Sequence, residues 1–323
     1  MFQLDKQPKK VEEEYIKRFL PKLEERIKNG SKGIKLNCRQ KSVLLPNWRT
    51  DKPDESILKK LLIGQPKEIK DLNDQIMSEM EGRFSNQIKL LNRLLHIFDY
   101  ERVFDNSKSN SYWLARKIGR NTCTYCNRIY TFTVVRGKGK NDRERIARPT
   151  FDHWFPKDKY PLLSLSLYNL IPSCPICNSS VKGNTYFSLE KYIHPYVKEQ
   201  GHPKFEFIPD KTTEVHPKWT VQIKRAEGSK EDNTIKAFAL DDMYHMHGPL
   251  EVTDIMNFKE RYPDNYLKTL VTKVLNDSNG KLTIQDVYSM LFGTDLNPDH
   301  YLDRPLSKMK RDLLKYLKII EVH

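Results

Sequence analysis

Four of the five cysteines form two Cys-x-x-Cys pairs, Cys123/Cys126 and Cys174/Cys177, and Cys38 stands alone. Two residues between a pair of thiolates let one tight turn present both sulfurs to the same ion, so two such pairs complete the closed tetrahedral shell of a structural zinc site. The alternative is four buried, reduced thiols that pack as small apolar side chains. The pairs enclose a long insertion, residues 127–173, which the site would hold at both ends.

The insertion and the residues after it carry groups that suit hydrolysis of a phosphodiester. A neutral imidazole near pH 7 can accept a proton from water, which makes His153 the candidate general base. A hard cation such as Mg²⁺ or Mn²⁺ prefers oxygen ligands, and Asp152 and Asn178 supply them. Adjacent side chains of a strand diverge, so Asp152 can hold the ion while His153 faces water. Asn169 is expected to hold the long loop and to orient His153.

Five elements in this order resemble the HNH endonuclease family. They are Asp152-His153, Asn169, the second cysteine pair, Asn178 directly after it, and Lys182-Gly183. The resemblance covers about a fifth of the chain, between Cys123 and Asn184, and the last letter of the motif, often His, is Asn178 here. It implies an α+β fold with a small ββα-metal core and a treble-clef zinc site. It also implies DNA as the substrate, and its general layout is that of bacterial anti-phage proteins that act with a partner ATPase.

Each residue also has a simpler interpretation. An isolated Asp-His is usually a surface pair, and Asp299-His300 has neither a following Asn nor a cysteine pair. Asn169 and Asn178 are common turn or cap residues, and Lys182 could be an exposed helix-end cation rather than a phosphate contact. Two other functions remain open. One is a non-catalytic zinc module that binds nucleic acid or protein, and the other is a nuclease toxin held by an immunity protein.

The charge of the chain favours an acidic partner. Lys and Arg number 56 against 42 Asp and Glu, a formal net charge of +14, and nucleic acid is the commonest partner for such a balance. Solubility alone is the alternative. The predicted DNA-phosphate contacts are Lys138, Lys140, Arg143, Arg145 and Lys182. The first four fall in a turn and its flanks, which could equally be a solvated loop.

Three regions are expected: a helical region 1–111, the zinc-containing core 112–190, and a C-terminal region 191–323 with a β-hairpin followed by helices. Apolar periodicity predicts helices at 11–27, after Pro66 and at 88–98, with a break at Pro21. Later helices are predicted at 252–261, 264–275, 283–292 and 305–318. Strands are predicted at 129–135 and 146–152, and 205–208 is predicted to pair with 219–223. No apolar run suits a membrane span or a signal, so a cytoplasmic protein without membrane contact is expected. The oligomeric state is left open.

Overall fold

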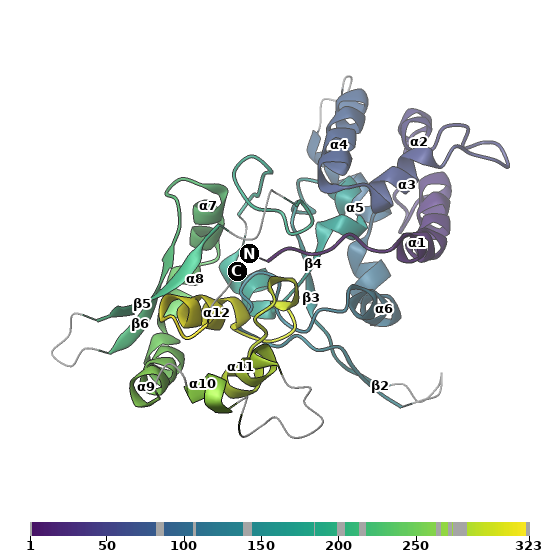
Figure 1. Ribbon diagram of the computed structural model, residues 1–323. Coiled ribbons are helices and arrows are strands. Elements are labelled where there is room, and N and C mark those ends of the chain that lie inside the picture. The colour runs from purple at the N-terminus through teal and green to yellow at the C-terminus, as the bar shows by residue number, and fades with distance from the viewer. Residues whose placement is uncertain are drawn as a thin grey trace.

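The computed structural model describes residues 2–81, 87–105, 108–137, 144–183, 185–198, 204–212, 218–262, 266–270, 273 and 283–320. Over these residues the protein is a mixture of helices and three separate two-stranded antiparallel sheets (Figure 1). The α+β class expected from the sequence is therefore confirmed. None of the helices in these ranges combines the length and the apolar composition that crossing a membrane requires.

The N-terminal region is helical. Its elements are α1 Lys9–Asn29, α2 Cys38–Leu44, α3 Ser56–Ile63, α4 Pro66–Glu81, α5 Gln87–Ile97, the π-helical turn η1 Glu101–Asp105 and α6 Lys108–Ile118. The expected break at Pro21 does not occur, because α1 continues through it with a buried face that includes Tyr15 and Leu23. Two short helices, α2 and α3, occupy a stretch that its polar composition and prolines made us expect to be irregular. A capping box between Asn37 and Gln40 starts α2.

The central region contains β1 Val134–Arg136, β2 Glu144–Ala147, β3 Thr150–His153, η2 Pro161–Leu163, η3 Leu167–Asn169, β4 Leu170–Ser173 and η4 Ile176–Val181. The strand predicted at 146–152 is two strands, β2 and β3, with Pro149 between them, where a backbone donor is missing. Strand β3 pairs with β4, so that His153 lies opposite Leu170. A π-helical segment, η4, then follows β4 directly.

The C-terminal region begins with a sheet and continues with helices. Its elements are β5 Glu206–Lys211, β6 Trp219–Lys224, α7 Lys230–Ala237, α8 Leu240–His245, η5 Gly248–Val252, α9 Thr253–Arg261, α10 Tyr266–Thr269, α11 Ile284–Phe292, η7 Pro298–His300 and α12 Ser307–Tyr316. The predicted hairpin is confirmed as β5 paired with β6. Thr283 caps α11, as its position after Asn279-Gly280 suggested, by accepting a hydrogen bond from Asp286 N at 3.1 Å. Helices α7 and α8 were not expected.

One continuous cluster of buried apolar side chains joins the three regions. It includes Leu61 of α3, Trp154 just after β3 and Leu313 of α12. The N-terminal segment also crosses the central region, because Phe2 N donates to Thr124 O at 3.1 Å and Leu4 N donates to Pro195 O at 2.8 Å. The N-terminal segment therefore lies against the loop that carries the first cysteine pair, near the middle of the molecule (Figure 1).

Candidate functional site

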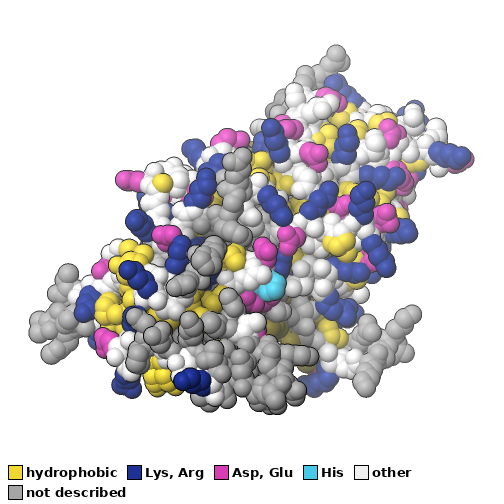
Figure 2. Space-filling view, in the orientation of Figure 1, with side chains coloured by type: hydrophobic (Ala, Val, Ile, Leu, Met, Phe, Trp, Pro, Cys, Tyr) yellow, Lys and Arg dark blue, Asp and Glu magenta, His cyan; other side chains and the backbone are white. Residues whose placement is uncertain are grey.

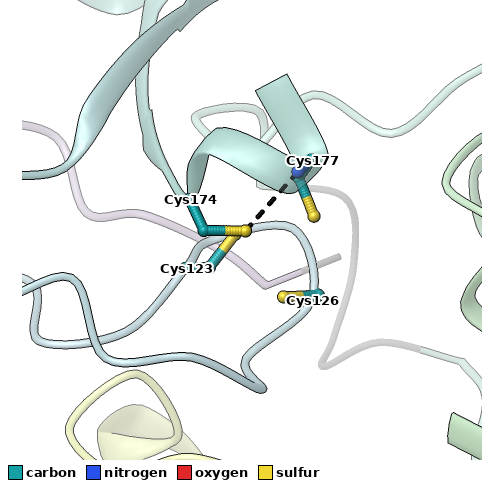
Figure 3. Close-up of side chains that lie close together, drawn as sticks. All are labelled: Cys123, Cys126, Cys174 and Cys177. Atoms are coloured by element: carbon teal, nitrogen blue, oxygen red, sulfur yellow. Dashed lines mark hydrogen bonds between the residues drawn. The ribbon is translucent and has the colours of Figure 1, made fainter. Parts of the chain in front are cut away.

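The four paired cysteines converge on one point. Their sulfur atoms all lie within 4.8 Å of one another, and all four residues are buried. Cys123 and Cys126 come from the loop before β1, whereas Cys174 and Cys177 come from the start of η4 (Figure 3). Tetrahedral Zn–S bonds of about 2.3 Å place sulfurs just under 4 Å apart, so this cluster is close enough to bind a metal such as zinc. The cluster predicted from the spacing is confirmed.

The chemistry of the donor set fits a cation. Burial raises the pKa of the Cys123 thiol well above its ordinary value, because a thiolate is poorly stabilised away from water. A bound zinc ion would supply the positive charge that lets these groups ionise. One sulfur already has a backbone donor, since Cys177 N lies 3.5 Å from Cys174 Sγ (Figure 3). The site is closed by four protein ligands, which is typical of structural zinc.

Tyr125 connects the loop of the first cysteine pair to the candidate catalytic residues. This residue stands between Cys123 and Cys126, its ring stacks on Phe238 at 4.2 Å, and its hydroxyl donates to Asp152 Oδ2. Sequence reasoning missed Tyr125. Its place inside a Cys-x-x-Cys turn was a usable signal, because any side chain there lies beside the metal site.

Asp152 is held in a buried ion pair. It is 5% exposed and its Oδ2 lies 2.6 Å from Lys182 Nζ, which also donates to His153 O at 2.6 Å. Lys182 is only 3% exposed. Burial lowers the pKa of Lys182, and the attraction of Asp152 acts in the opposite direction. Lys182, expected to contact phosphate, thus lies beneath the surface against the carboxylate expected to hold the metal.

Two oxygen atoms that could bind a metal ion, Asp152 Oδ1 and the side-chain oxygen of Asn178, have no hydrogen-bond partner among the described residues. The described contacts of the Asp152 carboxylate are made through Oδ2. Asn178 is half-buried, and its backbone N donates to Cys174 O, whereas its side-chain amide has no described partner. Asn178 lies in η4, and Lys182 directly follows η4 and reaches Asp152 of β3. The donors predicted for a divalent ion, Asp152 and Asn178, therefore come from two elements that pack together.

His153 is oriented separately from Asp152. Its Nε2 lies 3.0 Å from Ser164 O, and its ring meets the edge of Tyr100 with centroids 4.5 Å apart. A carbonyl oxygen can only accept, so Nε2 carries the hydrogen and Nδ1 keeps a lone pair. Burial lowers the pKa of His153 to about 3, against the opposing effect of the Ser164 carbonyl. The imidazole is therefore neutral at pH 7, in the state that a general base needs, although a pKa this far below neutrality weakens it as a base.

A small cavity lies next to this histidine. It measures about 280 Å³ and is formed by α5, η1 and the loop before η3, with Tyr100 and Ser164 in its lining. These are the two residues that contact His153. Lys157 also lines the cavity and pairs with Glu101 at 2.9 Å. Tyr100 comes from the N-terminal region, and no sequence pattern indicated that this residue would meet the histidine.

Asn169 fixes the loop between β3 and β4. It is completely buried, its Oδ1 accepts from Phe155 N at 2.7 Å, and its Nδ2 donates to Phe155 O at 3.1 Å and to Leu163 O at 2.9 Å. Leu163 directly precedes Ser164, whose carbonyl binds His153. Asn169 therefore acts on the histidine indirectly, by fixing the backbone that supplies its acceptor.

The basic hairpin stands apart from this group. Lys138, Lys140 and Arg143 lie outside the described residues. Arg145 is exposed in β2 opposite Val135, and the hairpin projects away from the body of the molecule (Figure 1). At about 3.4 Å per residue, Arg145 lies up to about 17 Å from the start of β3. Among the described residues, no contact links Arg145 to His153.

The segment just before β1 carries two exposed aromatic rings whose exposure the sequence did not indicate. Tyr130 and Phe132 are 49% and 46% exposed and stack on each other with centroids 4.5 Å apart. Elsewhere, Lys and Arg side chains are spread over the visible face of the molecule with Asp and Glu between them (Figure 2). On that face the positive charge is not gathered into one stripe.

Two further histidines have other surroundings. His300 of the second Asp-His pair is exposed and contacts Asp295 Oδ2 at 3.1 Å, far in sequence from the cysteines. His194 is buried against Trp154, and its Nδ1 accepts from Tyr196 N at 3.2 Å. His194 thus packs in the core, as expected of a structural histidine.

Comparison of the chain with protein-family models, with curated proteins and with solved structures gives no match. The function is therefore argued from the geometry of these residues.

Proposed function

We propose that the protein is a metal-dependent endonuclease of the HNH type that hydrolyses DNA phosphodiester bonds. One observation carries the proposal. His153 ends β3 with its Nε2 hydrogen-bonded to a backbone carbonyl, and its Nδ1 has no partner among the described residues. It directly follows a carboxylate, and η4, which packs on β3, begins beside the cysteine cluster. This arrangement supports a general base that takes a proton from water at Nδ1. The cysteine cluster, as a zinc site, would keep η4 in place against β3.

The divalent ion of the proposal would be held by Asp152 and Asn178. Their oxygen atoms suit Mg²⁺ or Mn²⁺, and Asp152 Oδ1 and the Asn178 amide have no other partner among the described residues. When bound, the ion would neutralise charge on the leaving oxygen. The ammonium group of Lys182 already lies beside Asp152 and provides a positive charge there. In the proposal it shares Asp152 with the ion or turns toward the scissile phosphate.

Nicking of supercoiled plasmid in Mg²⁺ or Mn²⁺ tests the general base. The chain offers a matched control, because His300 also follows an aspartate but is exposed and contacts Asp295 rather than the candidate catalytic residues. His153→Ala is expected to lose roughly 10²–10⁴-fold in cleavage rate, the usual contribution of positioned proton transfer. His300→Ala should cleave like wild type, and both should bind DNA. Near-wild-type cleavage by His153→Ala would refute this role.

A metal titration separates the base from the ion ligands. Asp152→Ala and Asn178→Ala should lose activity through weaker ion binding, so excess Mg²⁺ should restore part of it. His153→Ala should stay inactive at every ion concentration. The zinc content of the three variants should equal that of wild type, since the cysteines are unchanged. Failure of excess ion to restore either ligand variant would remove Asp152 and Asn178 from the proposed ion site.

The basic hairpin is proposed to hold DNA outside the catalytic group. Neutralising Lys138, Lys140, Arg143 and Arg145 together should reduce the slope of log affinity against log salt, because each phosphate contact releases counterions. The cleavage chemistry should be retained at saturating DNA. An unchanged salt slope would mean that the hairpin does not contact phosphate.

A non-catalytic zinc module that binds nucleic acid or protein is the second candidate. The observation that favours it is the burial of Asp152 under Lys182 and Tyr125, which leaves this carboxylate less accessible than a catalytic ligand usually is. Such a module would bind DNA or a protein without cleaving, in Mg²⁺ and in Mn²⁺ alike. Complete absence of nicking by zinc-loaded wild type, alone and with its genomic neighbours, would select this function.

The biological role proposed is that of an effector in anti-phage defence, working with a partner ATPase. Its support is the general layout described above, and a nuclease toxin with an immunity partner is the alternative. Co-expression with the products of adjacent genes separates them. An ATPase neighbour that activates cleavage supports the first role, whereas a small neighbour that inhibits it supports the second.

A further inference from the structure

The C-terminal helix presents a basic face to the end of the β5–β6 sheet. Lys308, Arg311 and Lys315 recur at the spacing that places side chains on one side of a helix. This side lines a cavity of about 550 Å³ between α12 and the sheet. Lys308 is fixed there by Asp312, at 2.6 Å, and lies over the ring of Phe205 at 4.8 Å. The proposed nuclease does not use this face.

The sheet supplies the opposite wall. Glu206 and Lys224 lie opposite each other where β5 begins and β6 ends. Around the whole cavity, six cationic side chains face two carboxylates. The cations are Lys204, Lys224, Arg225, Lys308, Arg311 and Lys315, and the carboxylates are Glu206 and Asp312. Surface side chains of one charge usually point away from one another into solvent. These six cations instead line one cavity, from the side of α12 and from the side of the β5–β6 sheet.

Several of these cations lack a carboxylate within the described residues. Arg225 pairs with Asp232 and Asp241, and Lys308 pairs with Asp312, but no described acid pairs with Lys204, Lys224, Arg311 or Lys315. Arg311 also has a buried Nε–H without an acceptor, while its terminal nitrogen donates to Tyr301 OH at 3.0 Å. A buried guanidinium N–H without an acceptor is costly. An oxyanion bound in the cavity would accept this missing hydrogen bond.

We propose that this cavity binds the polyphosphate group of a small nucleotide such as a nucleoside triphosphate. Several phosphates on one ligand match several unpaired cations, and Arg311 provides the planar donor geometry that suits phosphate oxygens. The volume lies in the range of small-molecule sites. The cavity is formed by β5, β6 and α12, none of which contributes to the proposed nuclease site, so this inference goes beyond that function.

Isothermal titration of the full-length, zinc-loaded protein with ATP and with inorganic tripolyphosphate tests the site. Lys224→Gln/Lys315→Gln removes two exposed cations of the cavity that have no described partner, so the fold should be retained. Lys17→Gln/Lys67→Gln is the matched control, since it removes the same charge from exposed positions on α1 and α4. The cavity variant is expected to bind both ligands at least about 10-fold more weakly, as lost charge-assisted contacts imply. The control should stay within about 2-fold of wild type.

Four outcomes would overturn the proposal. The first is no binding of ATP or tripolyphosphate by wild type, and the second is equal weakening in both double variants, which would indicate a general charge effect. In the third, a short DNA duplex displaces ATP, and the cavity variant loses DNA and ATP binding to the same degree. The cavity would then belong to a nucleic-acid surface. Adenosine should not bind, and adenosine binding as tight as that of ATP would contradict recognition through phosphate. Measured without a divalent ion, these outcomes do not depend on whether His153 supports cleavage.

Discussion

The Lys182–Asp152 pair offers a quantitative test of the candidate site. Lys182→Met keeps the length and the apolar stem of the side chain but removes its charge, which leaves the Asp152 carboxylate buried with Tyr125 as its remaining described donor. Breaking one side of a buried ion pair costs about 3–5 kcal/mol of unfolding free energy, since the other charge stays uncompensated. The same loss is expected for Asp152→Asn, which leaves the buried ammonium without its partner.

The double variant decides whether this loss reflects burial of a charge. Asp152→Asn/Lys182→Met removes both charges together, and replacing a whole buried pair is often close to neutral. Its cost should therefore fall several kcal/mol below the sum of the single costs, as measured by urea unfolding with zinc retained. Lys70→Met is the matched control, because Lys70 and Asp74 form a more exposed pair and such pairs contribute less than about 1 kcal/mol. A cost below about 1 kcal/mol for Lys182→Met would refute the buried pair.

The same variant bears on the proposed divalent ion. Without Lys182, the ion would be the main cation near Asp152, so Mg²⁺ should restore part of the lost stability in Lys182→Met. It should restore none in the double variant, where the carboxylate is gone. Equal Mg²⁺ responses in the two variants would mean that Asp152 does not hold the ion.

Further predictions concern the loop, the cysteines and the core. Asn169→Ala should lower the unfolding free energy by about 2–5 kcal/mol, since it leaves two buried backbone groups of Phe155 unpaired, and urea unfolding measures it. Cys174→Ser should abolish the one tightly held zinc per chain expected from elemental analysis and destabilise the protein; well-folded wild type without zinc would contradict the site. Burial lowers the pKa of His194 well below its usual value, so the unfolded chain binds its proton first as the pH falls below about 6.5. Stability should therefore be full above that pH and decline below it by up to about 1.4 kcal/mol per pH unit, a decline that His194→Gln should reduce.

The elements of the site that local sequence encodes were predictable. The cysteine spacing indicated one cluster because Cys-x-x-Cys is a short-range geometric requirement, and the cluster is present. The residue pattern of 146–152 predicted a strand before His153, and β2 and β3 form there. The long amphipathic helices α1, α4 and α5 were also found, since their periodicity extends over several turns.

The contacts that determine the chemistry were not predictable. Tyr100, Ser164 and Lys182 meet His153 or Asp152 across separations that no local pattern encodes. The expectation that Lys182 would face phosphate came from a motif, whereas its burial depends on how η4 packs on β3. Short elements were also missed: α2 and α3 depend on tertiary packing of a few side chains rather than on a long periodic face.

The loop of the first cysteine pair is also a junction for the whole chain, and this affects how any test of the site is interpreted. Asn127, next to Cys126, donates to Tyr301 O at 2.7 Å and to Arg304 O at 3.0 Å. Tyr244 OH donates to Cys126 O. Loss of the metal would therefore loosen the C-terminal region as well as η4, and cysteine variants would lose activity in a nuclease and binding in a non-catalytic module alike. The imidazole of His153, in contrast, contacts Ser164 and Tyr100 at the rim of a cavity. A comparison of wild type with His153→Ala, at equal zinc content and with the fold retained, therefore separates a loss of catalysis from a loss of structure.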